Sequence, residues 1–216
     1  MEWGWTTKFL VGNLQLGSVF KKAEQFLLKD KYIRPLIKKW GMCTLKKSPK
    51  TNYFRDLFES IVNQQLSGKA ASTIFGRITK LCKGKITPEV VLKTPDEKFR
   101  SAGLSHQKIK YVKDLADKIR KKEIDLERID SLSDEEIIAE LVKVKGIGCW
   151  TAEMFLMFSL ARLDIFPVDD LGIKKGFEKV TSKKWVKDKS ANFAKKYWSP
   201  YRTVASWYLW RSLENS

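Results

Sequence analysis

Signals for the start and end of helices recur along the whole chain, and no stretch alternates apolar and polar residues between hairpin turns as strands do. Two of these starts, Thr87-Pro88 and Thr94-Pro95, place proline early in the helix with acidic residues directly after it. A chain punctuated in this way is expected to fold as a mainly α protein. The expected helices lie at about residues 30–41, 53–63, 67–84, 105–120 and 133–144, the last opened by a capping box of Ser133 and Glu136.

Basic residues outnumber acidic ones by a wide margin. The 216 residues include 42 Lys and Arg against 25 Asp and Glu, which gives a formal charge of +17 and an isoelectric point near 9.7. Solubility alone does not require this excess, so it favours a polyanionic partner, with nucleic acid ahead of a membrane surface or a solvated lysine face. A hydrophobic fraction of 43% suffices for a core in one domain or in two small lobes. No apolar run is long enough to span a bilayer, and we expect a soluble protein.

The cysteines and the histidine exclude several kinds of site. Cys43, Cys82 and Cys149 are odd in number and scattered, which argues against a disulfide framework or a clustered metal centre and fits a reducing, intracellular setting. That setting would be the cytoplasm or nucleoid of a prokaryote or the nucleus of a eukaryote. His106 is the single histidine, so a multi-histidine zinc centre is excluded. Residues 1–20 have no basic leader or cleavage site and are expected to form an irregular extension.

A helix, a tight glycine turn and a second apolar helix follow one another in LVKVKGIGCWTAEMFLMFSL, within about residues 133–160. Gly146 and Gly148 permit unusual φ values and a close approach of the backbone, and the amides that open the second helix can donate to a phosphate. Lys145 adds positive charge beside the turn. Glycine pairs also occur at helix corners for steric reasons, so the turn by itself is weak support for a DNA contact.

Four segments together resemble the DNA glycosylase superfamily that is built around a helix-hairpin-helix motif. They are FRDLFESIVNQQLSGKAAS, LVKVKGIGCWTAEMF, FPVDDLGIKKGF and YWSPYRTVASWYLWRSL, and they stand in the family's order. The last of them resembles the alkylpurine branch, typified by DNA-3-methyladenine glycosylase II. The resemblance implies a mainly α, two-lobed core over residues 30–216 with the active-site cleft between the lobes, and residues 1–29 as an N-terminal extension with a first helix. Too few residues precede Asp30 for the mixed α/β lobe of that family, and so we expect a compact form.

Hydrolysis of an N-glycosidic bond builds positive charge on the sugar, so the reaction needs an anion beside the sugar and an activated water. Asp169 and Asp170 directly precede a predicted helix, whose N-terminal amides stabilise a carboxylate. Ordinary N-capping would explain either residue on spacing alone. The register of the resemblance selects Asp170 as the catalytic carboxylate, which would stabilise the oxocarbenium-like state and help to activate water.

The resemblance also distinguishes hydrolysis from strand nicking, which requires a lysine amine as nucleophile. Trp150 occupies the hairpin position where endonuclease III-like members carry that lysine, and the sequence has no C-terminal cluster of four cysteines. Lys174 and Lys175 follow Asp170 but are interpreted as phosphate or solvent contacts. The sequence therefore indicates a monofunctional enzyme that requires no cofactor.

Two further sets of residues are expected to handle the extruded base. Gln65 lies in the turn where the family inserts the side chain that fills the gap, although a swap with Gln64 stays open. Trp150 and Trp210 are assigned to the base pocket, but either could instead belong to the protein core. Two pocket positions lack the aromatic residues of the typical bacterial enzyme, so a preference for 3-methyladenine and 7-methylguanine is a hypothesis. The residues assigned to the pocket for an electron-poor alkylated purine are Trp150, Trp210, Met154 and Leu171, the last two being the departures.

Damaged double-stranded DNA is the expected partner, with no membrane and no obligate protein partner, and the protein is expected to act as a monomer. The predicted outcome is excision of alkylated purines in base excision repair, which leaves an abasic site. Two alternatives stay open: a non-catalytic DNA-binding module with the same hairpin, and a glycosylase for mismatched or oxidised bases that also nicks the strand. At the hairpin, phosphates are expected at Lys145, Gly146, Gly148 and Thr151, and the resemblance implies a sodium or potassium ion on the carbonyls of Val142, Val144 and Ile147.

Overall fold

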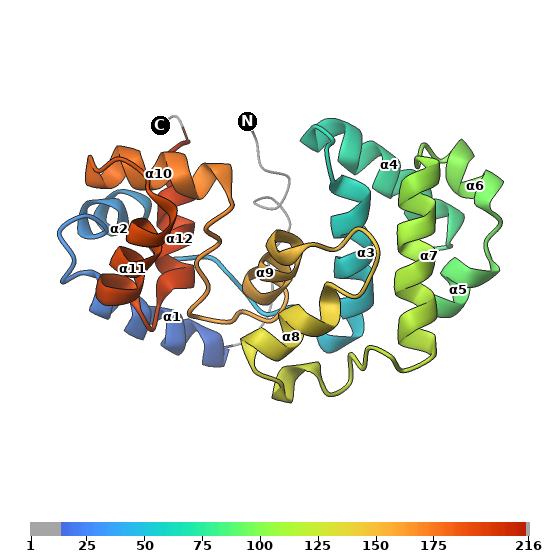
Figure 1. Ribbon diagram of the computed structural model, residues 1–216, viewed down its shortest axis with the longest axis horizontal. Helices are drawn as coiled ribbons and strands as arrows, with labels where there is room; N and C mark the ends of the chain where they lie inside the picture. The colour runs from blue at the N-terminus through green and yellow to red at the C-terminus, as the bar shows by residue number, and fades with distance from the viewer. Residues whose placement is uncertain (1–13, 215–216) are drawn as a thin grey trace. The chain divides into compact units, whose positions relative to one another are not determined.

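The computed structural model describes residues 14–214, with side chains from residue 19 onward. Every α-helix expected from the sequence is present, and residues 14–214 contain no strand, which confirms the mainly α fold (Figure 1). The helices are α1 (Leu14–Leu27), α2 (Arg34–Trp40), α3 (Tyr53–Asn63), α4 (Gly68–Leu81), α5 (Pro88–Lys93), α6 (Asp96–Ser101), α7 (His106–Arg120), α8 (Asp134–Leu141), α9 (Cys149–Phe158), α10 (Leu171–Thr181), α11 (Lys187–Trp198) and α12 (Arg202–Arg211), with short 3-10 turns η1 (Lys50–Asn52) and η2 (Ile129–Ser131).

The described chain divides into two compact units, in agreement with the two-lobed fold expected from the sequence. Residues 48–155 form the first, termed the hairpin unit because it contains the glycine turn. Residues 14–47 and 156–214 belong to the second, termed the aspartate unit because it contains Asp170. The boundary falls inside α9, so this helix contributes residues to both units.

The first helix corrects one expectation. The sequence suggests an irregular extension over residues 1–20, but residues 14–20 form the first half of α1. Phe20, Ala23 and Leu27 repeat at helical spacing and are buried in the aspartate unit, where α1 packs on α12. Gly17, a poor helix former, obscures the helical signal in the first turns. The rest of the predicted extension, residues 1–13, lies outside the described residues.

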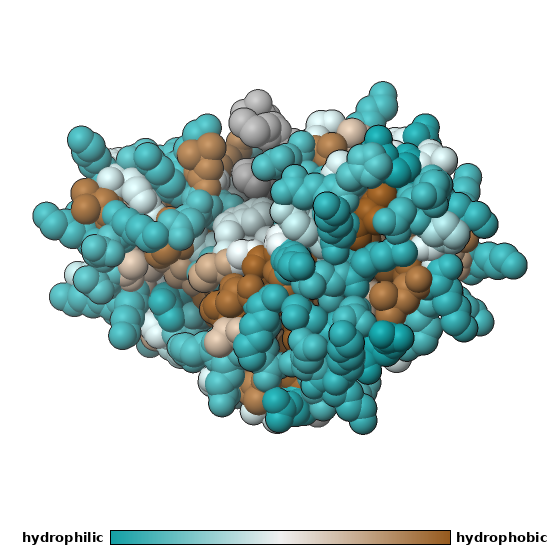
Figure 2. Space-filling model, turned by 45° about the vertical axis from the view of Figure 1, so that its right-hand side comes forward, coloured by the Kyte–Doolittle hydropathy of each residue, from teal (hydrophilic) through white to brown (hydrophobic). Residues whose placement is uncertain are grey.

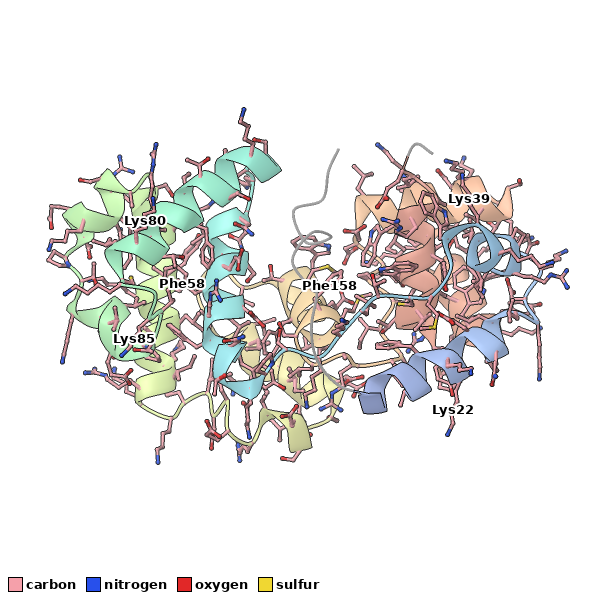
Figure 3. The ribbon with its side chains drawn as sticks, turned by 180° about the vertical axis from the view of Figure 1, so that it is seen from behind. Lys22, Lys39, Phe58, Lys80, Lys85 and Phe158 are labelled. Carbon is pink, nitrogen blue, oxygen red and sulfur yellow. The ribbon has the colours of Figure 1, made fainter. Side chains whose placement is uncertain are left out.

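The hairpin unit is built around α3 and α7, which pack together. α4 packs on α3, and α5 and α6 pack on α7. Phe58 of α3 is fully buried, and its ring lies near those of Phe54, Phe75 and Phe99 (Figure 3). Local signals in the sequence set the helix starts of this unit. The side-chain caps are Ser67 on α4, Thr87 on α5, Ser105 on α7 and, on α8, the predicted capping box of Ser133 and Glu136.

α12 is the central helix of the aspartate unit, with α1, α2, α10 and α11 packed around it. Its residues 203–209 are all buried, as is typical of a helix enclosed on every side. Gly176 allows α10 to approach closely, because a Cβ there would lie 2.6 Å from a backbone oxygen of α12. Glu24 of α1 is buried and accepts hydrogen bonds from the Cys43 amide and the Tyr208 hydroxyl. Burial raises the pKa of the Cys43 thiol and of the Tyr208 hydroxyl, so both stay protonated at neutral pH.

Polar side chains dominate the surface. Hydrophilic residues cover most of the face shown in Figure 2. No helix within residues 14–214 has the length and apolarity needed to cross a membrane. Among the exposed apolar side chains, Leu171 is 55% exposed and directly follows Asp170, which places it at the site described next.

Candidate functional site

Asp170 and Asp169 have different environments although they are neighbours in the chain. Asp170 is only 3% exposed and is the N-cap of α10, where its Oδ1 accepts a hydrogen bond from the Ile173 amide at 2.8 Å. Asp169 is exposed, and its carboxylate forms an ion pair with Lys187 at 2.5 Å. Of the two carboxylates, Asp170 is therefore the one that is held in a fixed orientation and shielded from bulk water.

Trp210 bonds directly to this carboxylate, a contact that the sequence did not indicate. Its indole Nε1 donates to the same Oδ1 of Asp170 at 2.9 Å. The indole is half-buried and stacks on Phe158, with the ring centroids 5.7 Å apart and the ring planes 27° apart (Figure 3 labels Phe158). A Cβ at position 172 would lie 2.8 Å from the indole, so Gly172 allows Trp210 to reach the carboxylate. Two N–H donors thus converge on one carboxylate oxygen and stabilise its negative charge.

The loop before Asp170 is fixed by the start of α12. Arg202 donates from Nε to the Asp164 carboxylate at 2.8 Å, and the Ser199 hydroxyl donates to its other oxygen, also at 2.8 Å. The Thr203 hydroxyl accepts the Ile165 amide at 2.9 Å. Partial burial would raise the pKa of Asp164, but the hydrogen bonds from Arg202 and Ser199 outweigh it and lower the pKa, so the carboxylate stays charged at neutral pH. Both ends of the segment that carries Asp170 are therefore anchored.

The other predicted pocket residues differ in how much surface they offer. Leu171 is exposed, and Trp150, in the first turn of α9, is half-buried, so either can contact a ligand. Met154 is only 4% exposed. That burial does not support a direct contact between Met154 and a base. For Trp150 and Trp210, the partial exposure argues against a purely core role.

The two hairpin glycines differ in conformation and in the space around them. Gly146 has φ +83°, and a Cβ there would lie 2.1 Å from the Tyr111 ring. Gly148 has no positive φ, and a Cβ there would meet no atom within 4 Å. The protein itself requires glycine at position 146. At position 148 the open space would serve the approach of a partner's backbone.

The side chains beside the hairpin also separate into two kinds. Lys145 is exposed, and its amide donates to the Asp114 carboxylate at 2.9 Å. Thr151 is only 5% exposed, so its hydroxyl is poorly placed for a phosphate and its contribution is limited to the backbone. α9 begins at Cys149, so the amides of its first turn follow Gly148 directly, and amides at a helix start are suited to donate to a phosphate.

The turn after α3 distinguishes the two glutamines. Gln64 donates from its side-chain amide to the Gly146 carbonyl at 2.8 Å, so its side chain is part of the scaffold. Gln65 is exposed and has φ +56°, the left-handed conformation that commonly ends a helix. These environments favour Gln65 over Gln64 for insertion into DNA.

Main-chain carbonyls are the groups near the hairpin that suit a cation. The Val144 carbonyl accepts the Ile147 amide at 3.0 Å and keeps a second lone pair for another partner. Neutral carbonyl oxygens of this kind fit a monovalent cation better than a transition metal. Within residues 14–214, no group of His, Cys, Asp and Glu is arranged to hold a metal ion.

Comparison with known proteins identifies relatives over most of the chain. Residues 58–200 match the family described as HhH-GPD superfamily base excision DNA repair protein. The chain is 33% identical over 202 residues to the alkylbase DNA glycosidase-like protein mag2 of Schizosaccharomyces pombe, which covers 90% of this chain and 94% of that protein. It is 38% identical over 176 residues to DNA-3-methyladenine glycosylase 1 of the same yeast, with 77% of this chain and 73% of that protein covered.

A solved structure is similar as well. It is the 3-methyladenine DNA glycosylase Mag1 of the same yeast in complex with abasic DNA, with a TM-score of 0.79 and 35% identity. The match covers 88% of this chain and 96% of that one.

Proposed function

The chain belongs to the HhH-GPD superfamily of base excision DNA repair proteins, and on this premise we propose that it is a monofunctional DNA glycosylase that excises alkylated purines. 3-Methyladenine and 7-methylguanine are the proposed substrates. Relatives that are 33–38% identical over most of the chain bear names of alkylbase and 3-methyladenine glycosylases. The single observation that carries the proposal to a mechanism is the buried Asp170 carboxylate, with two N–H donors on one of its oxygens.

Asp170 acts on the sugar rather than on the base. As the bond between the base nitrogen and the sugar carbon breaks, the electron pair leaves with the base and positive charge develops on the sugar. The carboxylate stabilises that charge, and the oxygen of a water molecule then bonds to the sugar carbon while the water proton is lost towards Asp170. The Ile173 amide and the Trp210 indole hold the carboxylate in one orientation throughout. An alkylated purine needs little further help, because its positive charge already weakens the bond.

Water is the proposed nucleophile because no lysine stands at the hairpin position occupied by Trp150. Lys174 and Lys175 follow Asp170 on α10, but both are exposed. The half-buried faces of Trp150 and Trp210, with the exposed Leu171, are proposed to contact the base. The product is DNA with an abasic site and an intact strand.

Double-stranded DNA is the proposed partner, with the protein acting inside the cell as a monomer. Mag1, the similar structure, is in complex with abasic DNA. The net charge of +17 suits a phosphate backbone, and Gly148 leaves room for its approach. Gln65 is proposed to fill the gap that the extruded base leaves. A sodium or potassium ion on the carbonyls of Val142, Val144 and Ile147 belongs to the proposal too, and duplex binding compared in potassium and tetramethylammonium chloride at one ionic strength would reveal it.

The decisive experiment measures release of free base from methylated duplex DNA. The wild-type protein should release 3-methyladenine, and Asp170→Asn should lose roughly a thousandfold or more in rate while its affinity for duplex is kept. Asn can still accept the bond from the Ile173 amide, so α10 keeps its cap. Asp169→Asn, one residue away on the exposed side, is the matched control and should keep its rate within about threefold.

Three outcomes would contradict the proposal. Asp170→Asn with full activity would remove the assigned carboxylate, and a wild-type protein that binds duplex but releases no base would indicate a DNA-binding module. Borohydride trapping of a covalent complex would indicate a lysine nucleophile and strand nicking instead of hydrolysis.

A further inference from the structure

One face of α7 holds two separate elements of the hairpin unit. Lys108, Tyr111 and Asp114 are spaced by three residues, so their side chains emerge on one side of the helix. The Lys108 ammonium donates to the carbonyls of Val62 at 2.7 Å and Gln64 at 2.5 Å. Its neighbours on α7 bind the other element, since the Tyr111 ring packs on the Gly146 backbone and the Asp114 carboxylate accepts the Lys145 amide.

These two elements are also linked to each other. The Gln64 side chain donates to the Gly146 carbonyl at 2.8 Å, which joins the turn after α3 to the glycine hairpin. Lys108 binds the same turn through a second group, the Gln64 carbonyl. A peptide group is planar, so the orientation of the Gln64 carbonyl also sets that of the Gln65 amide. The bond from Lys108 to the Gln64 carbonyl and the bond from the Gln64 side chain to Gly146 thus hold Gln65 in its left-handed conformation, φ +56°.

We propose that Lys108 and Gln64 are positioning residues that fix the Gln65 side chain relative to the DNA-gripping hairpin, with α7 as the common support. The inference rests on the proposed function, in which Gln65 fills the gap in the duplex. Neither residue needs to touch the reacting atoms. They determine the position of the Gln65 side chain when the hairpin is bound to the DNA backbone.

The chemistry of Lys108 supports a built contact rather than a chance one. The lysine is half-buried beneath the turn, and burial lowers the pKa of its ammonium. Two other lysines of α7 bind elsewhere, since Lys113 pairs with Asp96 and Lys118 with Glu123. Capping the last carbonyls of α3 would stabilise the helix in any case. A positioning role makes a prediction that helix capping does not make. Loss of Lys108 should change the affinity for damaged DNA more than the affinity for undamaged DNA.

The test is the ratio of two affinities. The hairpin contributes to every duplex, whereas an inserted Gln65 contributes only where a base is missing or extruded. We would therefore measure binding to an undamaged duplex and to one that carries a stable tetrahydrofuran abasic analogue. Lys108→Met should weaken binding to the abasic-analogue duplex by roughly tenfold and to the undamaged duplex by less than about twofold. Lys108→Arg, which keeps a charged donor, should recover most of the ratio.

A matched control and a second variant sharpen the test. Lys110→Met removes an exposed lysine from the same helix and should leave the ratio of the two affinities unchanged, because the loss of a surface charge affects both duplexes alike. Gln64→Leu removes the link to Gly146 and should lower the ratio as Lys108→Met does, so the inference stays testable if either variant unfolds. 2-Aminopurine placed opposite the abasic analogue should give a weaker fluorescence change with both variants.

Two results separate this inference from the proposed function. If the wild-type protein releases base from methylated duplex and both variants keep the wild-type affinity ratio, the positioning role is wrong and the glycosylase stands. If the wild-type protein releases no base, the glycosylase is wrong, and a lowered ratio still supports the positioning role because binding needs no chemistry. A lower unfolding temperature of Lys108→Met with an unchanged ratio would reduce Lys108 to a helix cap.

Discussion

The two units of the chain differ in net charge and in the structural elements that they contain. Residues 14–47 and 156–214 contain 21 Lys and Arg against 8 Asp and Glu, while residues 48–155 contain 20 against 16. The aspartate unit thus carries most of the net charge of +17, although the elements proposed to contact DNA, the hairpin and the turn of Gln65, belong to the other unit. On the proposed function, attraction to phosphates and recognition of their geometry would be supplied by separate parts of the molecule.

The same contrast applies to how each unit holds its functional groups. In the hairpin unit the contacts are mostly to main-chain atoms, as with Lys108 on the Gln64 carbonyl and Tyr111 on Gly146. In the aspartate unit they converge on a side chain, the Asp170 carboxylate. A unit that fixes backbone is suited to grip a repeating polymer, and a unit that fixes one carboxylate is suited to chemistry at one bond.

The largest effect is expected from the glycines of the hairpin. Gly146→Ala should cost about 2–4 kcal/mol of folding free energy, because the left-handed φ and the clash with Tyr111 are both unfavourable. Gly148→Ala should change stability by less than about 0.5 kcal/mol but weaken duplex binding several-fold, because its Cβ occupies the space left for a partner. Urea unfolding and duplex titration would measure the two effects.

Gly76 of α4 provides the control for that pair. A Cβ there also meets no atom within 4 Å, so Gly76→Ala should raise the stability of α4 by about 0.8–1 kcal/mol, because alanine favours a helix interior, and should leave duplex affinity unchanged. Full duplex affinity of Gly148→Ala would show that no backbone approaches position 148. The proposal that the hairpin unit recognises the geometry of the DNA backbone would then lose its main support.

A smaller effect is expected from the indole on the catalytic carboxylate. Trp210→Phe keeps a ring to stack on Phe158 but removes the donor to Asp170, so base release should slow by roughly tenfold at unchanged duplex affinity. Trp207→Phe, on the same helix, makes an equally conservative change and should keep the rate. Single-turnover kinetics would measure both. An unchanged rate in Trp210→Phe would confine that residue to packing.

The smallest effect is expected from the distributed charge. Replacing Lys183, Lys184 and Lys189 of the aspartate unit by Gln should lower the slope of duplex affinity against salt by about one for each phosphate that the protein no longer neutralises. The matched triple in the hairpin unit, Lys80, Lys85 and Lys98 to Gln, should leave the slope nearly unchanged. Equal slopes for the two triples would contradict the division of charge and shape between the units.

Much of the fold could be predicted because the signals are local. Ser133 and Glu136 form the predicted capping box at the start of α8, and the helix at residues 53–63 has the predicted bounds. A first helix was expected within residues 1–29, but its start at Leu14 was not, because Gly17 interrupts a stretch whose apolar residues show their spacing only further along the helix.

The contacts within the site could not be predicted because they join residues far apart in the chain. Asp170 and Trp210 are separated by 40 residues, and Lys108 and Gln64 by 44. The family resemblance indicated which residues matter, yet it assigned Trp210 to the base pocket without its bond to the carboxylate. It also counted Thr151 among the phosphate contacts, although the side chain is buried. Such details depend on tertiary packing, which a single sequence does not reveal.

The double role of Asp170 bears on how a protein of this kind can evolve. The residue caps α10 and is also the proposed catalytic carboxylate, and asparagine caps helices equally well. A single nucleotide substitution in an aspartate codon yields asparagine, so catalysis can be lost in one mutational step while the helix, the fold and the hold on DNA persist. Descendants that detect lesions without cutting out a base are therefore always one mutation away, and selection for repair must keep removing them from the population.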